Sequence, residues 1–291
     1  LFEDAALGFS HTLVIEKETK RLLAFGDNAR GQVGVDPATT TTVTSPTMPK
    51  GVDTDETFVK VSAGLFHSAA VSQTGDLVTF GCARFGQSLQ DQEVGRWRPS
   101  DGSRVVDVAC GRRHTVILDE YGRVWTMGEN KYHQLGRSIV DGKKTDGFPK
   151  LVDGVLGKKE SGCVAITAGW SHAVATVKRG DHTSLFGWGR NDKGQLGTGT
   201  TDLVLEPAPI FETVDATTAS CGSESTVVLD ADGQVWGTGW NEHGNLATGD
   251  EKDTFRPSKF TGARLVGPPP TRSDGSILFA AGGGHFISMR I

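Results

Sequence analysis

The chain has 291 residues, a formal net charge of −5 and 39 glycines, which is about twice the usual share of glycine. This charge gives no global attraction to nucleic acid or to an acidic membrane, and no apolar run approaches the ~18 residues of a membrane span. We therefore expect no direct nucleic-acid binding and no membrane partner. High glycine without low complexity suits many short strands joined by tight turns, because glycine enters positive φ without steric cost.

The first of two recurring motifs is Gly-x-x-His followed by an apolar, strand-like segment. Its six copies begin 56, 47, 58, 53 and 60 residues apart, and the fifth copy has serine in place of histidine. The positions are Gly8 and His11, Gly64 and His67, Gly111 and His114, Gly169 and His172, Gly222 and Ser225, and Gly282 and His285. A period near 55 residues indicates a repeat array rather than an ordinary mixed domain.

The second motif is a glycine-rich loop that follows a turn and another strand. Its fullest copy is FGWGRNDKGQLGTG at Phe186–Gly199, and four further copies begin at Phe25, Phe80, Met127 and Thr238. Within a repeat, short β-branched segments such as His114–Leu118 and Arg123–Met127 predict strands. A further strand, such as Val105–Cys110, precedes each Gly-x-x-His. Units of three or four antiparallel strands repeated in this way are typical of the blades of a β-propeller.

The motif pair resembles the regulator of chromosome condensation family, whose repeats carry a Gly-x-x-His-Thr strand and then a Trp-Gly-x-Asn-x-x-Gly-Gln-Leu-Gly loop. The resemblance covers the whole chain and implies an all-β propeller, usually of seven blades. About five and a half repeats are visible, so we expect six or seven blades, with closing strands upstream of Leu1. The expected single domain spans 1–291, with repeats at 1–57, 58–104, 105–163, 164–215, 216–276 and, in part, 277–291.

The histidines at the repeated position are expected to be structural. Radial symmetry places them in different blades, where each satisfies backbone groups nearby instead of converging on a metal. Ser225 at the equivalent position agrees with a hydrogen-bonding role. The four cysteines include no CxxC pair, and no nucleophile elbow occurs. We expect no catalytic residue, no metal and no cofactor.

Aromatic residues and arginines in loops are typical anchors of protein interfaces. Arg96-Trp97-Arg98 is one candidate interface, and the alternative for it is a blade-linking segment with Trp97 buried. Trp170 and the run Trp240-Asn241-Glu242-His243 are the other candidates, because they stand in loops. Trp125, Trp188 and Trp236 are expected in the core.

Two passages, residues 97–125 and 221–245, are similar to the fungal alpha-tubulin suppressor group of killer-toxin-insensitivity proteins. The second passage also resembles the animal secretion-regulating exchange-factor-like group. The resemblance implies an adaptor that binds a small zinc-ribbon protein and supports Elongator-dependent modification of tRNA wobble uridines and diphthamide synthesis. It places Trp97, Trp240 and His243 at the interface.

Two other functions stay open at the level of sequence. One is guanine nucleotide exchange on a small GTPase, as in the founder of the family, although the repeat spacings leave no long insertion for a projecting wedge. The other is a generic propeller domain that acts as a scaffold in a larger protein. In each case we expect the chain to work in the cytoplasm, the nucleus or both.

Overall fold

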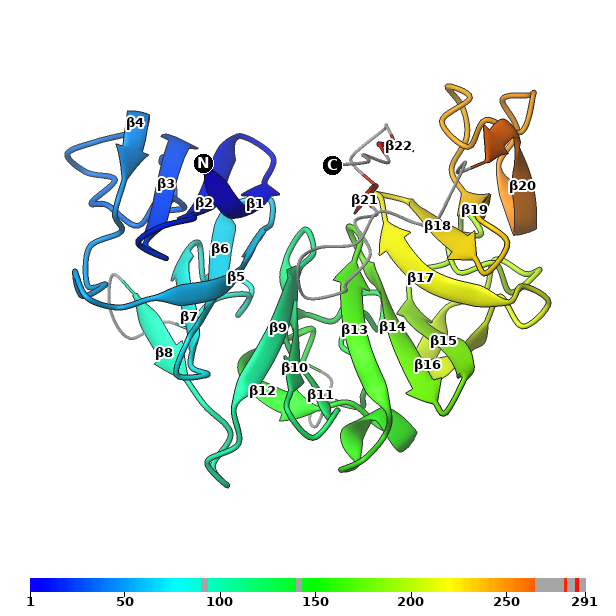
Figure 1. The fold of residues 1–291 in the computed structure, drawn as a ribbon, viewed down its shortest axis with the longest axis horizontal. Helices are drawn as coiled ribbons and strands as arrows, with labels where there is room; N and C mark the ends of the chain where they lie inside the picture. The colour runs from blue at the N-terminus through cyan, green and yellow to red at the C-terminus, as the bar shows by residue number, and fades with distance from the viewer. Residues whose placement is uncertain (90–93, 140–142, 265–279, 282–285, 288–291) are drawn as a thin grey trace. The chain divides into compact units, whose positions relative to one another are not determined.

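The computed structural model describes residues 1–89, 94–139, 143–264, 280–281 and 286–287. This part of the chain contains no α-helix, and its elements are β-strands with a short 3-10 turn, η2 (Val155–Gly157). The strands form five four-stranded antiparallel sheets and a two-stranded sheet (Figure 1). The all-β fold predicted from the repeats is thereby confirmed. No helix in the described residues is long and apolar enough to cross a membrane.

The chain divides into two compact units. The first unit comprises residues 1–131 and 137–161 and holds three of the sheets. Its strands are β1 (Phe2–Leu7), β2 (His11–Glu16), β3 (Leu22–Asp27), β4 (Thr42–Thr47), β5 (Phe58–Ala63), β6 (His67–Ser72), β7 (Leu77–Gly81), β8 (Gly95–Trp97), β9 (Val105–Cys110), β10 (His114–Asp119), β11 (Val124–Glu129) and β12 (Thr145–Leu151).

The second unit comprises residues 132–136 and 162–291, so it includes a five-residue loop that lies between parts of the first unit in sequence. Its strands are β13 (Cys163–Ala168), β14 (His172–Arg179), β15 (His182–Gly189), β16 (Val204–Ile210), β17 (Ala216–Cys221), β18 (Ser225–Asp230), β19 (Gln234–Gly239), β20 (Thr254–Arg264), β21 (Ala280–Ala281) and β22 (Phe286–Ile287).

The register of each sheet aligns the two sequence motifs. Strands follow one another in chain order, and the second and third strands form a hairpin. Each motif histidine, or Ser225, lies directly opposite a glycine of the second motif. The pairs are His11 and Gly26, His67 and Gly81, His114 and Gly128, His172 and Gly189, and Ser225 and Gly239. Both motifs therefore lie at the same end of each four-stranded sheet.

The fourth strand of each sheet is an edge strand. Four of these strands contain proline, for example Pro46 in β4 and Pro149 in β12. Proline cannot donate a ladder hydrogen bond, so it is confined to edges of a sheet. The same prolines weaken the strand signal in the sequence, which is why the repeat could be predicted only as three or four strands.

The hydrophobic cores lie between consecutive sheets within a unit. Leu13 and Ile15 of β2 pack in one cluster with Phe58 of β5 and Phe80 of β7, and all four side chains are almost fully buried. In the second unit, Val174 and Leu185 share a cluster with Val228. Alternation along each strand sends these side chains to the buried face, and truncating a buried Phe to Ala typically costs about 3–5 kcal/mol.

Candidate protein-interaction surface

Two loops meet at one end of each four-stranded sheet, the end at which both motifs lie. We call these two loops the loop face of that sheet. One backbone hydrogen bond of 2.8–2.9 Å joins the two loops in all five sheets. The donor amides and acceptor carbonyls are Asp27 to Ser10, Cys82 to Phe66, Glu129 to Arg113, Arg190 to Ser171, and Trp240 to Glu224. At Gly239, whose φ is +109°, an added Cβ would overlap the carbonyl oxygen of Glu224, so this junction requires glycine.

The first motif makes a tight turn under its own histidine. The amide of the opening glycine donates to the carbonyl of the residue three positions on, at 2.9–3.0 Å, in all the described copies. The pairs are Gly8 and His11, Gly64 and His67, Gly111 and His114, Gly169 and His172, and Gly222 and Ser225. The sixth copy, Gly282 and His285, lies outside the described residues. At Gly8, Gly64 and Gly169 an added Cβ would overlap the ring of the motif histidine, so these positions require glycine.

The motif histidines connect neighbouring sheets. The Nε2 of His11 lies 2.9 Å from the hydroxyl of Ser68, and the Nε2 of His67 lies 3.0 Å from the hydroxyl of Thr115. In the second unit, His172 makes the equivalent contact with Thr226 at 3.2 Å. The sequence predicted that each histidine has a hydrogen-bonding role toward nearby backbone groups. The structure adds a side-chain partner that was not predicted, a hydroxyl of the next sheet along the chain.

The hydroxyl also fixes the histidine tautomer. Ser68 Oγ donates to the carbonyl of Gln32, and Thr115 Oγ1 donates to that of Gln87, each at 2.7 Å. Since the hydroxyl proton is used in this way, Nε2–H of the histidine must be the donor to the hydroxyl oxygen. Burial lowers the pKa of His11 and His172 to about 4 and that of His67 to about 3. These rings are therefore neutral at physiological pH and act as structural donors.

The four cysteines are buried or half-buried, and none forms a disulfide. All four cysteines are free, and burial raises the pKa of Cys110 and Cys221 to about 12, so both stay protonated. No group of three or more His, Cys, Asp and Glu side chains in the described residues is placed to hold a metal ion. The chemistry that the described side chains offer is hydrogen bonding, ion pairing and aromatic contact.

Arg96, Trp97 and Arg98 lie on the edge strand β8 and just after it, and all three are engaged inside the first unit. Trp97 is only 9% exposed and its ring contacts that of Trp125 edge-on at 5.2 Å. Arg96 binds Glu56 with two nitrogens at 2.6 and 2.7 Å, and Arg98 binds Asp76 at 2.9 Å. This arrangement matches the alternative of a blade-linking segment with a buried tryptophan, and it leaves Trp97 no surface to offer a partner.

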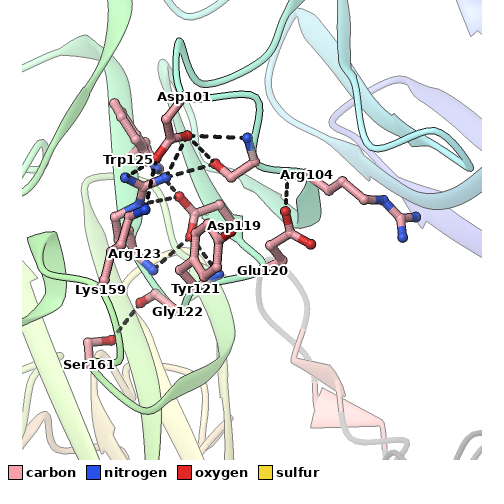
Figure 2. A network of polar contacts seen from close by, with 11 residues as sticks. Asp101, Arg104, Asp119, Glu120, Tyr121, Gly122, Arg123, Trp125, Lys159 and Ser161 are labelled. Atoms are coloured by element: carbon pink, nitrogen blue, oxygen red, sulfur yellow. Dashed lines mark hydrogen bonds and ion pairs between the residues drawn. The ribbon is translucent and has the colours of Figure 1, made fainter.

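At the opposite end of the third sheet, Arg123 lies between Asp101 and Asp119 (Figure 2). Its guanidinium binds the buried Asp119 carboxylate at 2.6 Å and Asp101 at 2.9 Å. The hydrogen bond from Arg123 holds the pKa of Asp101 well below its ordinary value. The indole of Trp125 also donates to Asp119, at 2.9 Å. The network fixes the linker at Asp101 to the β10–β11 turn, so it is structural.

The second-unit loop faces bring together most of the remaining candidates. The amide of Trp170 donates to the carbonyl of Ser223 at 2.8 Å, and the amide of Trp240 donates to that of the next residue, Glu224, at 2.9 Å. Trp170 is 38% exposed, and the Trp240 ring contacts the exposed His243 edge-on at 5.1 Å. We call Trp170, Ser223, Glu224, Trp240 and His243 the tryptophan surface.

Charged side chains border the tryptophan surface. Arg190 forms ion pairs with Glu224 and with Asp192, and its guanidinium lies 5.2 Å from the ring of Tyr132. Lys193 bridges Glu242 and Asp253, each at 3.2 Å, and these hydrogen bonds raise the pKa of Lys193 and lower that of Glu242. The surface thus combines two indoles and an imidazole with a border of paired charges.

Asn241 has a different role from its neighbours in the sequence. It is fully buried, its side-chain oxygen accepts from the amide of Leu246 at 2.8 Å, and its Nδ2 donates to the carbonyls of Asp250 and Lys252. Asn191 and Asn28 hold their own loops in the same way. Asn241 therefore shapes the loop and cannot itself reach a partner. The recurrence of Asn at one position of the second-motif loops could have indicated this structural role.

The fold and the loop faces define a β-propeller built from repeated Gly-x-x-His blades. A family model described as the RCC1-like domain matches residues 2–288. The chain belongs to the RCC1-like domain family.

Three known proteins illustrate this likeness. The ultraviolet-B receptor UVR8 of Arabidopsis thaliana is 34% identical over 214 residues, which cover 69% of this chain and 46% of the receptor. The human E3 ubiquitin-protein ligase HERC2 is 33% identical over 208 residues, covering 68% of this chain and 4% of the ligase. Yeast RCC1 (Prp20), solved with Kap60, has a TM-score of 0.75 and 21% identity, covering 96% of this chain and 65% of that one. The chain spans less than half the length of these two sequence relatives.

Proposed function

We propose that the chain is a non-catalytic protein-binding propeller domain whose partner contacts the tryptophan surface. The observation that carries the proposal is that the exposed Trp170 is hydrogen-bonded to Ser223, on the loop face of the next sheet, which also carries Trp240 and His243. Tryptophan is enriched among interface residues that dominate binding energy, since it buries a large area at low entropic cost. The border of Arg190, Lys193 and Glu242 supplies the polar rim that such interfaces have.

The finer proposal is an adaptor that binds a small zinc-ribbon protein and serves Elongator-dependent tRNA modification and diphthamide synthesis. It is supported by the Trp240-Asn241-Glu242-His243-Gly244 loop, which resembles the killer-toxin-insensitivity group. Trp97 is no longer part of the proposed interface, because it is buried. The four free thiols suit a reducing compartment, the cytoplasm or nucleus.

Regulation of a small GTPase is the second candidate. Prp20p of Saccharomyces cerevisiae has been characterised for its binding to Gsp1p and to histones, but likeness at about 20% identity carries only the fold to this chain. A third candidate is a domain of a larger protein, as the 4% coverage of HERC2 illustrates.

Affinity capture from source extract followed by mass spectrometry distinguishes these functions. We expect recovery of a zinc-ribbon protein, weakened by Trp240→Ala and Trp170→Ala by about 2 kcal/mol or more, as for central interface anchors. Phe148→Ala is the matched control, because Phe148 is 56% exposed on the edge strand β12 and belongs to the first unit.

Recovery of a GTPase whose nucleotide release the protein accelerates would contradict the adaptor. Zinc-ribbon binding that stays unchanged in both tryptophan variants would contradict the tryptophan surface.

A further inference from the structure

The loop faces of the first unit carry a group of arginines. Arg30 and Arg84 lie in second-motif loops, and Arg112 and Arg113 are the two central residues of the third Gly-x-x-His. The loops adjoin one another: the amide of Phe9 donates to the carbonyl of Gly64 at 3.2 Å, and Gly64 in turn packs against the carbonyl of Gly111. We call Arg30, Arg84, Arg112, Arg113 and Phe85 the arginine surface.

Phe85 orders part of this surface. The guanidinium carbon of Arg113 lies 4.2 Å from the centre of its ring, and that of Arg84 lies 5.6 Å from it. A guanidinium held over an aromatic face keeps its edge N–H groups available and is weakly hydrated, so it needs little reorganisation to bind a carboxylate. Arg113 also reaches Glu129 at 3.4 Å, which fixes its position from the other side.

Two acids on these loop faces, Asp27 and Glu129, are engaged within the first unit. Asp27 is engaged internally, since it accepts from the amide of Ala29 and from the side chains of Ser10 and Gln32. Glu129 is 13% exposed and lies against Arg113. Arg30 and Arg84 are exposed and form no ion pair with a described residue. Arg30 and Arg84 are thus the exposed arginines of the surface, whereas Arg113 is paired with Glu129.

We propose that the arginine surface binds an acidic, carboxylate-rich peptide segment of a partner protein. Arginine forks match carboxylates geometrically, and charge-assisted bonds of this kind are the strong ones. Phe9, 70% exposed beside the Gly64 loop, offers an apolar contact for the same segment.

The short range of the electrostatic attraction favours a peptide over nucleic acid as the ligand. Electrostatic attraction extends only about 8–10 Å at physiological salt, so a short segment senses the local arginines. A long polyanion would also meet the acidic remainder of the chain. The proposal is independent of the tryptophan surface, which belongs to the other unit.

Fluorescence anisotropy with a labelled 12-residue peptide of alternating Asp and Glu tests the proposal. We expect saturable binding at 50 mM NaCl that weakens as salt rises, because exposed charge pairs are screened. The double variant Arg30→Glu/Arg84→Glu should raise Kd by about tenfold or more, and Arg30→Gln/Arg84→Gln by a smaller factor. Arg21→Glu is the control, since Arg21 is exposed in the β2–β3 turn at the opposite end of its sheet.

Three results would overturn the proposal. One is an Arg21→Glu variant that weakens binding as much as the double charge reversal, which would show attraction to the whole chain. Another is a 12-nucleotide poly-dT strand that binds more tightly than the peptide. The last is absence of peptide binding at 50 mM NaCl. Circular dichroism of the glutamate and glutamine double variants should match that of the parent chain. A match shows that weaker peptide binding is not caused by misfolding.

Discussion

The hydroxyl of Thr115 lies 3.0 Å from the Nε2 of His67 and 2.7 Å from the carbonyl oxygen of Gln87, so one side chain joins two neighbouring repeats. Thr115→Val keeps the shape and removes both hydrogen bonds. We expect the free energy of unfolding to fall by about 2–3 kcal/mol, because two buried polar groups lose their partner. Urea denaturation measures this, with Thr44→Val on the exposed edge strand β4 as control. Equal effects of the two substitutions would refute the role of the hydroxyl.

Acid should weaken the fold before its carboxylates titrate. The pKa of His11 and His172 is about 4 in the folded chain and that of His67 about 3, against 6.5 when unfolded. Below pH 6.5 the unfolded chain binds more protons, so stability present at pH 7 is lost as the pH falls toward 4. Each histidine contributes up to about 1.4 kcal/mol per pH unit in that window. Denaturation midpoints between pH 7 and 4.5 should fall accordingly, and a flat profile would contradict the buried neutral rings.

Removing Arg123 should strand a buried charge. The Asp119 carboxylate is fully buried and depends on Arg123 for its ion pair at 2.6 Å. We expect Arg123→Ala to lower the free energy of unfolding by about 3–5 kcal/mol. Arg123→Lys should lower the free energy of unfolding by less than Arg123→Ala does, since lysine keeps the positive charge but loses the planar guanidinium geometry. Thermal denaturation compares these with Arg179→Ala, an exposed arginine of β14, where little change is expected.

Substitutions at two glycines distinguish the cost of backbone strain from the cost of steric overlap. Gly239 and Gly102 both have positive φ, but an added Cβ meets Glu224 and Ser225 at the first and nothing within 4 Å at the second. Gly102→Ala should cost about 1 kcal/mol from its φ alone. Gly239→Ala should cost clearly more and should also weaken partner binding, because it moves Trp240 relative to Glu224. Chemical denaturation of the two variants tests this, and similar losses would mean that the junction is not tight.

The fold was largely predictable from the sequence, because each repeat carries its own local signals. Gly-x-x-His, the hairpin turn and the glycine-rich loop all fall within about 25 residues, and they specify strands such as β9 to β11. The edge strands were harder to predict, since prolines such as Pro149 break the strand pattern. The buried place of Trp97 depends on Trp125, which comes from another sheet.

The candidate surfaces could be predicted only in part. Trp170 and Trp240 could be predicted because they stand in loops, but the Arg190–Glu224 pair joins residues 34 positions apart on different sheets. The hydroxyl partners of the histidines are about 50 residues away. A local sequence pattern carries no information about contacts between residues so far apart in the chain. The arginine surface could not be predicted for the same reason, since its members are spread over three repeats.

The loop at residues 132–136 also has a consequence for how the chain can be divided. It belongs to the second compact unit, where the carbonyl of Gln134 accepts a 3.0 Å hydrogen bond from the indole of the fully buried Trp188. Residues on both sides of it belong to the first unit. A single cut after Ser161 would therefore not yield two autonomous halves: the C-terminal piece would lack the acceptor of its own central indole, and the N-terminal piece would carry a loop without its counterpart.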